Sequence, residues 1–282
     1  MTPYRNQRAA ALPARLSRSV LLVGAGDPSA FVPALASEAD SVIFDIEDGL
    51  PEGQKEQGRA DVVEALNQGA GAWVRINDIH SEHWQADLDA LSGARNLRGI
   101  MLAKTESSDH ITRTAMMMPA GTPVIALIES ALGLVNANDI ARAPGVFRLA
   151  FGMGDFRRDT GASGDPMALA HARSTLVVAS RVGGLPGAID GPPGNTDGED
   201  AVVDSSAVTA SMGMTGRLVL NRDQVDWVNR AMSPSEDELA WARDLLEKHA
   251  QGAAVGDGSY LPRVLRAQKI ADLADSYGLW NA

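Results

Sequence analysis

Residues 99–128 read GIMLAKTESSDHITRTAMMMPAGTPVIALI, and this stretch holds a strand, a helix and a second strand in succession. Its two ends, GIMLA and PVIALI, are short and almost continuously apolar, which is typical of parallel strands covered on both faces. Between them Ile111, Ala115 and Met118 follow the i, i+4, i+7 spacing of one helix face. The stretch therefore predicts a strand–helix–strand unit of a parallel sheet.

The same alternation extends in both directions along the chain. Short apolar strand candidates stand at residues 19–23, 41–45, 72–76, 99–103, 123–128, 148–151, 187–190 and 217–220, with helix-like stretches in the gaps. Strands in strict alternation with helices, eight of each, predict an α/β fold of the closed (β/α)8 TIM barrel type.

A doubly wound sheet is the alternative to the barrel. It would need a phosphate-binding loop after the first strand. The segment Gly24-Ala25-Gly26-Asp27 supplies two of the three glycines of that fingerprint, and Ser29 stands at the position of the third. A partial match of this kind is weak, so we interpret the glycines as a tight turn.

The chain divides into three expected parts. Residues 1–18 carry four arginines ahead of the first acidic residue, Asp27, and we expect a flexible N-terminal arm more than a transit peptide. Residues 19–232 form the barrel, which is the catalytic domain. Residues 233–282 form a C-terminal helical segment. A barrel closes without this segment, so we expect a lid over the barrel mouth or an oligomerisation element.

The C-terminal segment contains signals for two helices and a linker between them. Ser233 and Glu236 have the spacing of a capping box, with Pro234 at the first helical position, so we expect a helix from there to about His249. Residues 252–258 are glycine-rich and predict a linker, and Pro262 begins a last helix.

Composition excludes several classes of protein. The 282 residues carry 36 acidic and 25 basic side chains, a net charge of −11, which disfavours nucleic acids and anionic membranes as partners. No cysteine is present, so disulfides, thiolate metal sites and a cysteine nucleophile are excluded. No apolar run approaches the roughly 18 residues that span a bilayer. A cytoplasmic protein fits these observations.

Polar residues collect where the predicted strands end. In a barrel these ends share one face, which carries the active site. They comprise Asp45, Glu47, Asp48, Arg75, Asn77, Lys104, Glu106, Glu129, Asp155 and Asp190. Carboxylates outnumber cations there, and neighbouring carboxylates repel and raise one another's pKa. A bound divalent cation such as Mg²⁺ or Mn²⁺ would compensate their charge, so we expect one at this face.

Each of these residues also has a structural interpretation. An acid after a strand often caps the next helix, and Arg75 or Lys104 could pair with an acid. None of the histidines, at positions 80, 83, 110, 171 and 249, is placed as a base at a strand end, so a Ser-His-Asp mechanism is disfavoured.

Several motifs occur together in a fixed order along the chain. They are Arg18-Ser19, Asp45-x-Glu47-Asp48, Val74-Arg75-Ile76-Asn77, Ala126-Leu127-Ile128-Glu129-Ser130, Leu149-Ala150-Phe151-Gly152-x-x-Asp155, Ala172-Arg173-Ser174 and Ala188-Ile189-Asp190-Gly191-Pro192. From Arg18 to about Met232 the chain resembles the citrate lyase β-subunit-like (CitE-like) branch of the HpcH/HpaI aldolase/citrate lyase family.

The resemblance implies a (β/α)8 barrel and a set of roles. Glu129 and Asp155 are the expected Mg²⁺ ligands, with Mn²⁺ possible, and Arg75 holds the substrate carboxylate or the developing oxyanion. Backbone N–H groups at Met153 and Gly154 cradle an oxo-acid carboxylate. Further expected contributors are Glu47 and Asp48, as catalytic residues with Arg75, and Asp190, as a substrate contact.

The implied reaction is the reversible carbon–carbon cleavage of a β-hydroxyacyl-CoA of the citryl-, malyl- or citramalyl-CoA type. It yields an acyl-CoA and an oxo acid, which are the expected small-molecule partners. The resemblance further implies a homo-oligomer, a trimer or hexamer, with the C-terminal segment near a neighbour's active site.

Three departures from the family pattern keep alternatives open. The chain has Gly24-Ala25-Gly26 where the family has Pro-Gly, and Leu220-Asn221-Arg222 where it has Ile/Leu-His-Pro. Tyr260 stands where some CoA lyases of the family place a catalytic aspartate, for which Asp257 could substitute. The alternatives are a metal-dependent, HpaI-like aldolase on free oxo acids, which would have a strand-end histidine base, and a non-catalytic barrel with a regulatory or binding role.

Overall fold

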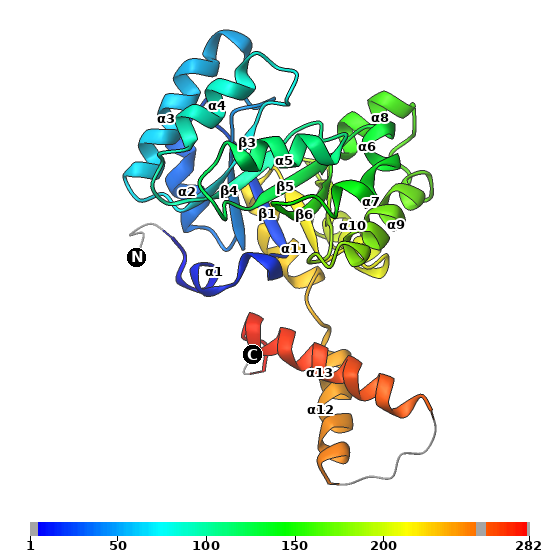
Figure 1. Ribbon diagram of the computed structural model, residues 1–282. Helices are drawn as coiled ribbons and strands as arrows, with labels where there is room; N and C mark the ends of the chain where they lie inside the picture. Colours follow the sequence, from blue (N-terminus) through cyan, green and yellow to red (C-terminus); the bar gives the residue numbers. More distant parts are fainter. Residues whose placement is uncertain (1–4, 252–257, 281–282) are drawn as a thin grey trace.

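Eight parallel strands close into a barrel in this computed structural model, which describes residues 5–251 and 258–280 (Figure 1). The strands are β1 (Ser19–Gly24), β2 (Ser41–Asp45), β3 (Ala72–Ile76), β4 (Leu97–Leu102), β5 (Val124–Ile128), β6 (Val146–Phe151), β7 (Ile189–Asp190) and β8 (Gly216–Val219). Each pairs with the next, and β8 returns to β1 through the register Val20↔Leu218. This closure confirms the (β/α)8 barrel and excludes the doubly wound sheet, which has two free edges.

Helices follow the strands around the outside of the barrel. They are α2 (Phe31–Ala36), α3 (Lys55–Asn67), α4 (His83–Leu91), α5 (Ser108–Met116), α6 (Ala131–Val135), α7 (Ala137–Ile140), α8 (Met153–Thr160), α9 (Pro166–Val182), α10 (Glu199–Ser211) and α11 (Val225–Ala231). Short 3-10 turns are η1 (Ala14–Leu16), η2 (Pro28–Ala30), η3 (Glu52–Gln54) and η4 (Arg222–Gln224). None of the described helices combines the length and apolarity needed to cross a bilayer.

Alternation along each strand separates two apolar cores. The larger core lies between strands and helices, and includes Val74 and Ile76 of β3. The smaller one fills the barrel interior and includes Trp73 from the same strand. Because side chains two residues apart share a face, Arg75 also points into the barrel, nearer to its carboxyl end. One strand thus carries an aromatic ring at the bottom of the barrel interior and a cation at its top.

The N-terminal segment is anchored to the barrel, with α1 at Gln7–Ala11. Arg8 donates to Glu38 at 2.7 Å and to Asp40 at 2.9 Å, and Ala9 is buried. Arg18 is buried too and is joined to Asp40 by several hydrogen bonds. The expectation of a flexible arm is therefore wrong over residues 5–18, because its arginines find carboxylates at the start of β2.

The C-terminal segment forms a helical hairpin of α12 (Glu236–Ala250) and α13 (Tyr260–Tyr277), joined by a chain that is partly outside the described residues. Its capping box is made by Ser235 and Glu238, two residues later than the sequence suggested. The predicted linker falls on residues 252–258, of which 252–257 are not described. A small core of Ala242, Ala267 and Ile270 holds the two helices together.

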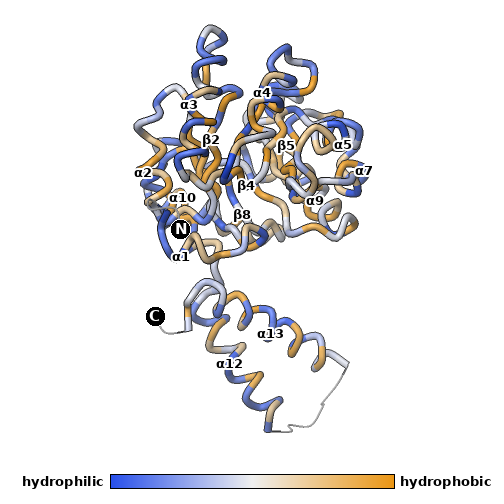
Figure 2. Tube along the Cα trace, turned by 60° about the vertical axis from the view of Figure 1, so that its left-hand side comes forward, coloured by the Kyte–Doolittle hydropathy of each residue, from blue (hydrophilic) through white to orange (hydrophobic). Residues whose placement is uncertain are grey.

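The hairpin lies at the N-terminal end of the barrel strands. The Tyr277 hydroxyl donates to the carbonyl of Leu16 at 2.9 Å, and the Arg18 guanidinium lies over the Tyr277 ring at 3.9 Å. Figure 1 shows the pair projecting from this end, and Figure 2 shows apolar and polar residues mixed along both helices. A lid over the barrel's own mouth is therefore ruled out, because the mouth is at the opposite end.

Candidate active site

The carboxyl ends of β2 to β6 bring charged side chains together at the barrel mouth. Arg75 is at the centre of the group. Its Nε donates to Asp45 Oδ1 at 2.8 Å, its Nη2 donates to Asp45 Oδ2 at 2.6 Å, and its Nη1 lies 3.2 Å from Glu47. Burial works against the charge, but the hydrogen bonds and the charges of Asp45 and Glu47 raise the pKa of Arg75. The guanidinium is a permanent cation facing the mouth.

Lys104 links two strand-end carboxylates. Its main-chain N–H donates to Glu129 Oε1 at 2.6 Å, and its side-chain ammonium Nζ donates to Glu47 Oε1 at 2.7 Å. Burial opposes the charge, yet the hydrogen bond to Glu47 raises the pKa of the ammonium. The backbone is left-handed here, with φ of 46°, which is unusual for a residue with a side chain. This conformation turns the N–H toward Glu129.

Glu129 and Asp155 each have one carboxylate oxygen without a hydrogen-bond partner among the described residues. The main-chain N–H of Lys104 donates to one Glu129 oxygen, while Asp155 Oδ1 forms an ion pair with Arg158 at 3.1 Å. The other, Asp155 Oδ2, is buried and has no hydrogen-bond partner among the described residues. Burial raises the pKa of Glu129 to about 8, and the charges of Glu47 and Asp155 add to the rise. Two hard oxygen donors in a repulsive, poorly solvated setting fit a divalent cation.

Helix α8 begins beside these carboxylates. Its N-cap is Gly152, which offers no side-chain cap, so the first N–H groups, at Met153 and Gly154, are not taken by a capping side chain. Gly152 packs so closely on Glu129 that a Cβ at this position would collide with that side chain. A Cβ at Gly154 would meet open space. The start of α8 can therefore accept an anion next to Glu129.

The two predicted catalytic acids of β2 differ in setting. Glu47 is buried, and Arg75, Lys104 and the N–H of Asp48 surround its oxygens. Asp48 is exposed at the rim. Glu47 therefore fixes two cations, and Asp48 is the acid of the pair that faces solvent.

Sequence reasoning missed Lys55, the first residue of α3. Its side chain is buried, and its ammonium donates to the carbonyls of Ile46 and Glu47 at 3.2 and 2.6 Å and to Asn77 Oδ1 at 2.9 Å. Lys55 thus supports the Asp45–Asp48 turn from below. A lysine at the start of a helix is usually solvated, so no signal in the sequence marked it.

Asp190 contradicts its predicted role. Its carboxylate is completely buried, accepts from Arg173 at 3.0 and 3.1 Å and from Thr209 at 2.6 Å, and also takes the N–H of Gly191. Both oxygens are occupied inside the protein, so Asp190 is not placed to bind substrate. It ties α9 and α10 to the end of β7.

Two histidines meet at the rim of the mouth, His80 from the loop after β3 and His110 from the first turn of α5, which follows β4. The rings of His80 and His110 lie edge to face with centroids 5.3 Å apart, and Glu106 N–H donates to His110 at 3.4 Å. Burial and the neighbouring His80 lower the pKa of His110. Within residues 5–251 and 258–280, neither ring bonds to Arg75, Glu129 or Asp155.

The C-terminal residues considered for acid–base chemistry lie elsewhere. Tyr260 is buried in the hairpin, where its hydroxyl is 3.2 Å from His249. Asp257 lies outside the described residues.

A closed barrel with a charged mouth at its strand ends defines the chain as a (β/α)8-barrel enzyme. A model of the HpcH/HpaI aldolase/citrate lyase family matches residues 18–222, and a model of the HpcH/HpaI aldolase C-terminal domain matches residues 237–278. The chain belongs to the HpcH/HpaI aldolase/citrate lyase family, in its CitE-like branch.

Similar proteins cover nearly the whole chain. The citrate lyase subunit beta of Leuconostoc mesenteroides subsp. cremoris is 28% identical, covering 93% of this chain and 94% of that protein. The mitochondrial citramalyl-CoA lyase of Rattus norvegicus is 27% identical, and the match covers 92% of this chain and 86% of that protein. The structure of CitE from Mycobacterium tuberculosis with magnesium, acetoacetate and coenzyme A matches with a TM-score of 0.78 and 28% identity, over 93% of this chain and 99% of that one.

Proposed function

We propose that this enzyme cleaves a β-hydroxyacyl-CoA of the citryl-, malyl- or citramalyl-CoA type into an acyl-CoA and an oxo acid, with a divalent metal ion. The observation that carries the proposal is that Glu129 feels the charges of Asp155 and Arg75, that one Asp155 oxygen is buried without a partner among the described residues, and that α8 begins at the same place. The names of the relatives support a CoA-related lyase, and the CitE complex with magnesium and coenzyme A supports the metal.

Glu129 and Asp155 would hold Mg²⁺, with Mn²⁺ as the alternative. The metal, when bound, supplies Lewis acidity toward a substrate hydroxyl and carboxylate. The chain's contribution is to keep the two carboxylates close. Lys104 holds Glu129 from one side through its main-chain N–H, and Gly152 packs closely against it from another.

Arg75 would stabilise negative charge that develops during cleavage. Its guanidinium is fixed by Asp45 and Glu47, so little reorganisation is needed when charge appears on the substrate. The planar fork of arginine suits a carboxylate or an enolate oxygen better than the single ammonium of a lysine does.

The start of α8 would orient the oxo acid. The N–H groups of Met153 and Gly154 carry the positive end of the helix, and a carboxylate placed there would sit next to Glu129. Asp48, the exposed acid of the rim, is the candidate for proton exchange, because Glu47 is already held by two cations.

The assembly would place the hairpin of one subunit on another. The hairpin lies at the end of its own barrel opposite the mouth, and it exposes 57% of Leu261 and 72% of Leu265. Exposed leucines on a projecting helix favour burial against a second copy. We therefore propose a homo-oligomer, for which the family resemblance implies a trimer or a hexamer.

A substrate panel tests the proposal. The full-length enzyme is incubated with Mg²⁺ and citryl-, malyl- and citramalyl-CoA, and in the reverse direction with acyl-CoAs and oxo acids, and the products are measured by mass spectrometry. We expect cleavage of one of the CoA esters, lost when Mg²⁺ is removed. Cleavage in the absence of Mg²⁺ would contradict the metal assignment. If none of the CoA esters were cleaved, the proposed lyase activity would be contradicted.

A second candidate is an aldolase acting on free oxo acids. The position of Tyr260 favours it, since that residue is packed on His249 where some CoA lyases of the family have an aspartate. The same panel without CoA separates the two, because an aldolase would form products from oxo acids and aldehydes alone.

A further inference from the structure

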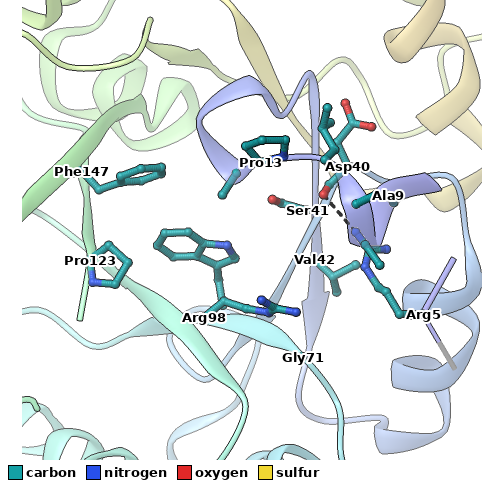
Figure 3. A pocket seen from close by; sticks show the side chains of 15 residues that line it. Arg5, Ala9, Pro13, Asp40, Ser41, Val42, Gly71, Arg98, Pro123 and Phe147 are labelled. Atoms are coloured by element: carbon teal, nitrogen blue, oxygen red, sulfur yellow. Dashed lines mark hydrogen bonds between the residues drawn. The ribbon is translucent and has the colours of Figure 1, made fainter. Parts of the chain in front are cut away.

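The N-terminal end of the barrel contains a hollow, far from the strand ends that form the mouth. It has a volume of about 370 Å³ and lies between the N-terminal segment and the first residues of β2 to β6. Figure 3 shows Phe147 and Pro123 on one side of it and Arg5 on the other. Its volume falls in the range of pockets that bind small molecules.

The accessible charges of this hollow are positive. Arg98 is exposed and pairs with no acid among the described residues. Arg5 also lines it, and among the described residues its guanidinium donates to the carbonyls of Leu35, Ala39 and Asp40. Asp40 contributes no free charge, because its fully buried carboxylate is bound by Arg8 and Arg18. Arg5 and Arg98 have no ion pair of their own among the described residues, so the hollow presents local positive charge, which attracts anions although the whole protein has a net charge of −11.

The remaining wall is flat and apolar. The rings of Trp73 and Phe147 are stacked with centroids 5.4 Å apart, and Pro123 lies with them at the hollow. Trp73 is only 4% exposed as a residue, but its indole N–H has no hydrogen-bond partner within residues 5–251 and 258–280 and is not among the buried polar atoms that lack a partner, so this N–H is open to solvent. A buried indole normally donates to some acceptor. A hydrogen-bond donor and an aromatic surface are therefore both available to a ligand here.

We propose that this hollow binds a small organic anion with a flat apolar body, its ring against Trp73 and Phe147 and its head group on Arg98 and Arg5. The shape and charge set the class: a ring to cover the aromatic wall, and an oxyanion, carboxylate or phosphate, to meet the two guanidinium groups. The site is independent of the mouth and does not rest on the lyase assignment.

Calorimetry on the full-length protein tests the site with four probes. These are 1-naphthoate, 1-naphthyl phosphate, neutral 1-naphthalenemethanol and acetate. We expect saturable binding of one naphthyl anion with a Kd below about 1 mM, and little binding of the alcohol, which lacks the charge, or of acetate, which lacks the ring. The better of the two anions identifies the head group.

Matched arginine variants locate the binding. Arg98→Gln should weaken binding by about tenfold, because a charge-assisted contact is lost. Arg95→Gln removes another exposed arginine, which lies outside the hollow, and should leave the Kd unchanged. Trp73→Phe should abolish the quenching of tryptophan fluorescence by 1-naphthoate. Absence of saturable binding, equal binding of the alcohol, or an unchanged Kd in Arg98→Gln would each overturn the proposal.

Discussion

The main-chain N–H of Lys104 points at Glu129 Oε1, 2.6 Å away, from a left-handed backbone with φ of 46°. A residue with a Cβ adopts this conformation at some cost, so it persists where the surroundings demand it. Here it fixes one oxygen of a carboxylate whose charge is disfavoured by burial. The side chain of the same residue holds Glu47, so one strained position organises acids from two strands.

Replacing Glu129 with glutamine should remove most of the metal affinity. The variant keeps the shape of the side chain and the acceptor for Lys104, but it loses a charged ligand, so we expect Mn²⁺ to bind at least about tenfold more weakly. Titration followed by electron paramagnetic resonance measures this. Glu106→Gln is the control, since Glu106 is a nearby acid that accepts from Ser130. Affinity equal to wild type in Glu129→Gln would reject the ligand assignment.

Metal binding should depend on pH through Glu129. With its pKa raised to about 8 by burial, this carboxyl is mostly protonated at neutral pH, and a metal must displace the proton. Affinity should therefore fall as the pH is lowered below 8, by up to about tenfold per pH unit. Calorimetry from pH 6 to 9 measures the slope. A flat profile for the wild-type protein contradicts the raised pKa, and Glu129→Gln should show a weaker slope.

Arg75→Lys should lose most of the lyase activity while fold and metal binding are kept. A lysine cannot reproduce the two-point contact, so we expect a loss of roughly 2–4 kcal/mol in transition-state binding, measured as kcat/KM. Circular dichroism and Mn²⁺ titration serve as controls for fold and site. If kcat/KM were unchanged, Arg75 would be only a structural partner of Asp45.

Lys55→Met should loosen the turn that carries Glu47 and Asp48. The variant leaves the carbonyls of Ile46 and Glu47 without their donor, and an unmet buried acceptor costs about 1–3 kcal/mol. Urea unfolding measures the stability loss, and a lower kcat should accompany it. Lys269→Met, at an exposed lysine of α13, is the matched control. Equal stability of the two variants would show that Lys55 does not support the turn.

The exposed leucines of α13 should control assembly. Leu261→Glu together with Leu265→Glu places charges on the proposed interface without touching the small core of the hairpin. We expect a smaller mass by light scattering, and the same result when residues 252–282 are deleted. Gln268→Glu, another exposed position on α13, should keep the wild-type mass. A monomeric wild-type protein, or a truncated protein with an unchanged mass, would contradict the role of the hairpin.

The sequence alone was enough for the barrel and for the location of its mouth. Strand period, helix period and the order of elements are local properties, so eight alternations predicted the closed sheet that β1 and β8 complete. The same reasoning put Arg75, Lys104, Glu129 and Asp155 on one face, because the strands are parallel and their ends coincide.

Partnerships between side chains were decided by the tertiary structure. Asp190 resembled an open strand-end acid until α9 and α10 brought Arg173 and Thr209 onto it, and Lys55 looked like a solvated helix residue until the turn at Glu47 folded over it. The C-terminal hairpin lies at the N-terminal end of the barrel because Tyr277 contacts Leu16 and Arg18 there. A sequence pattern reports which face a residue occupies, whereas burial and pairing depend on atoms that are distant along the chain and meet only when it folds.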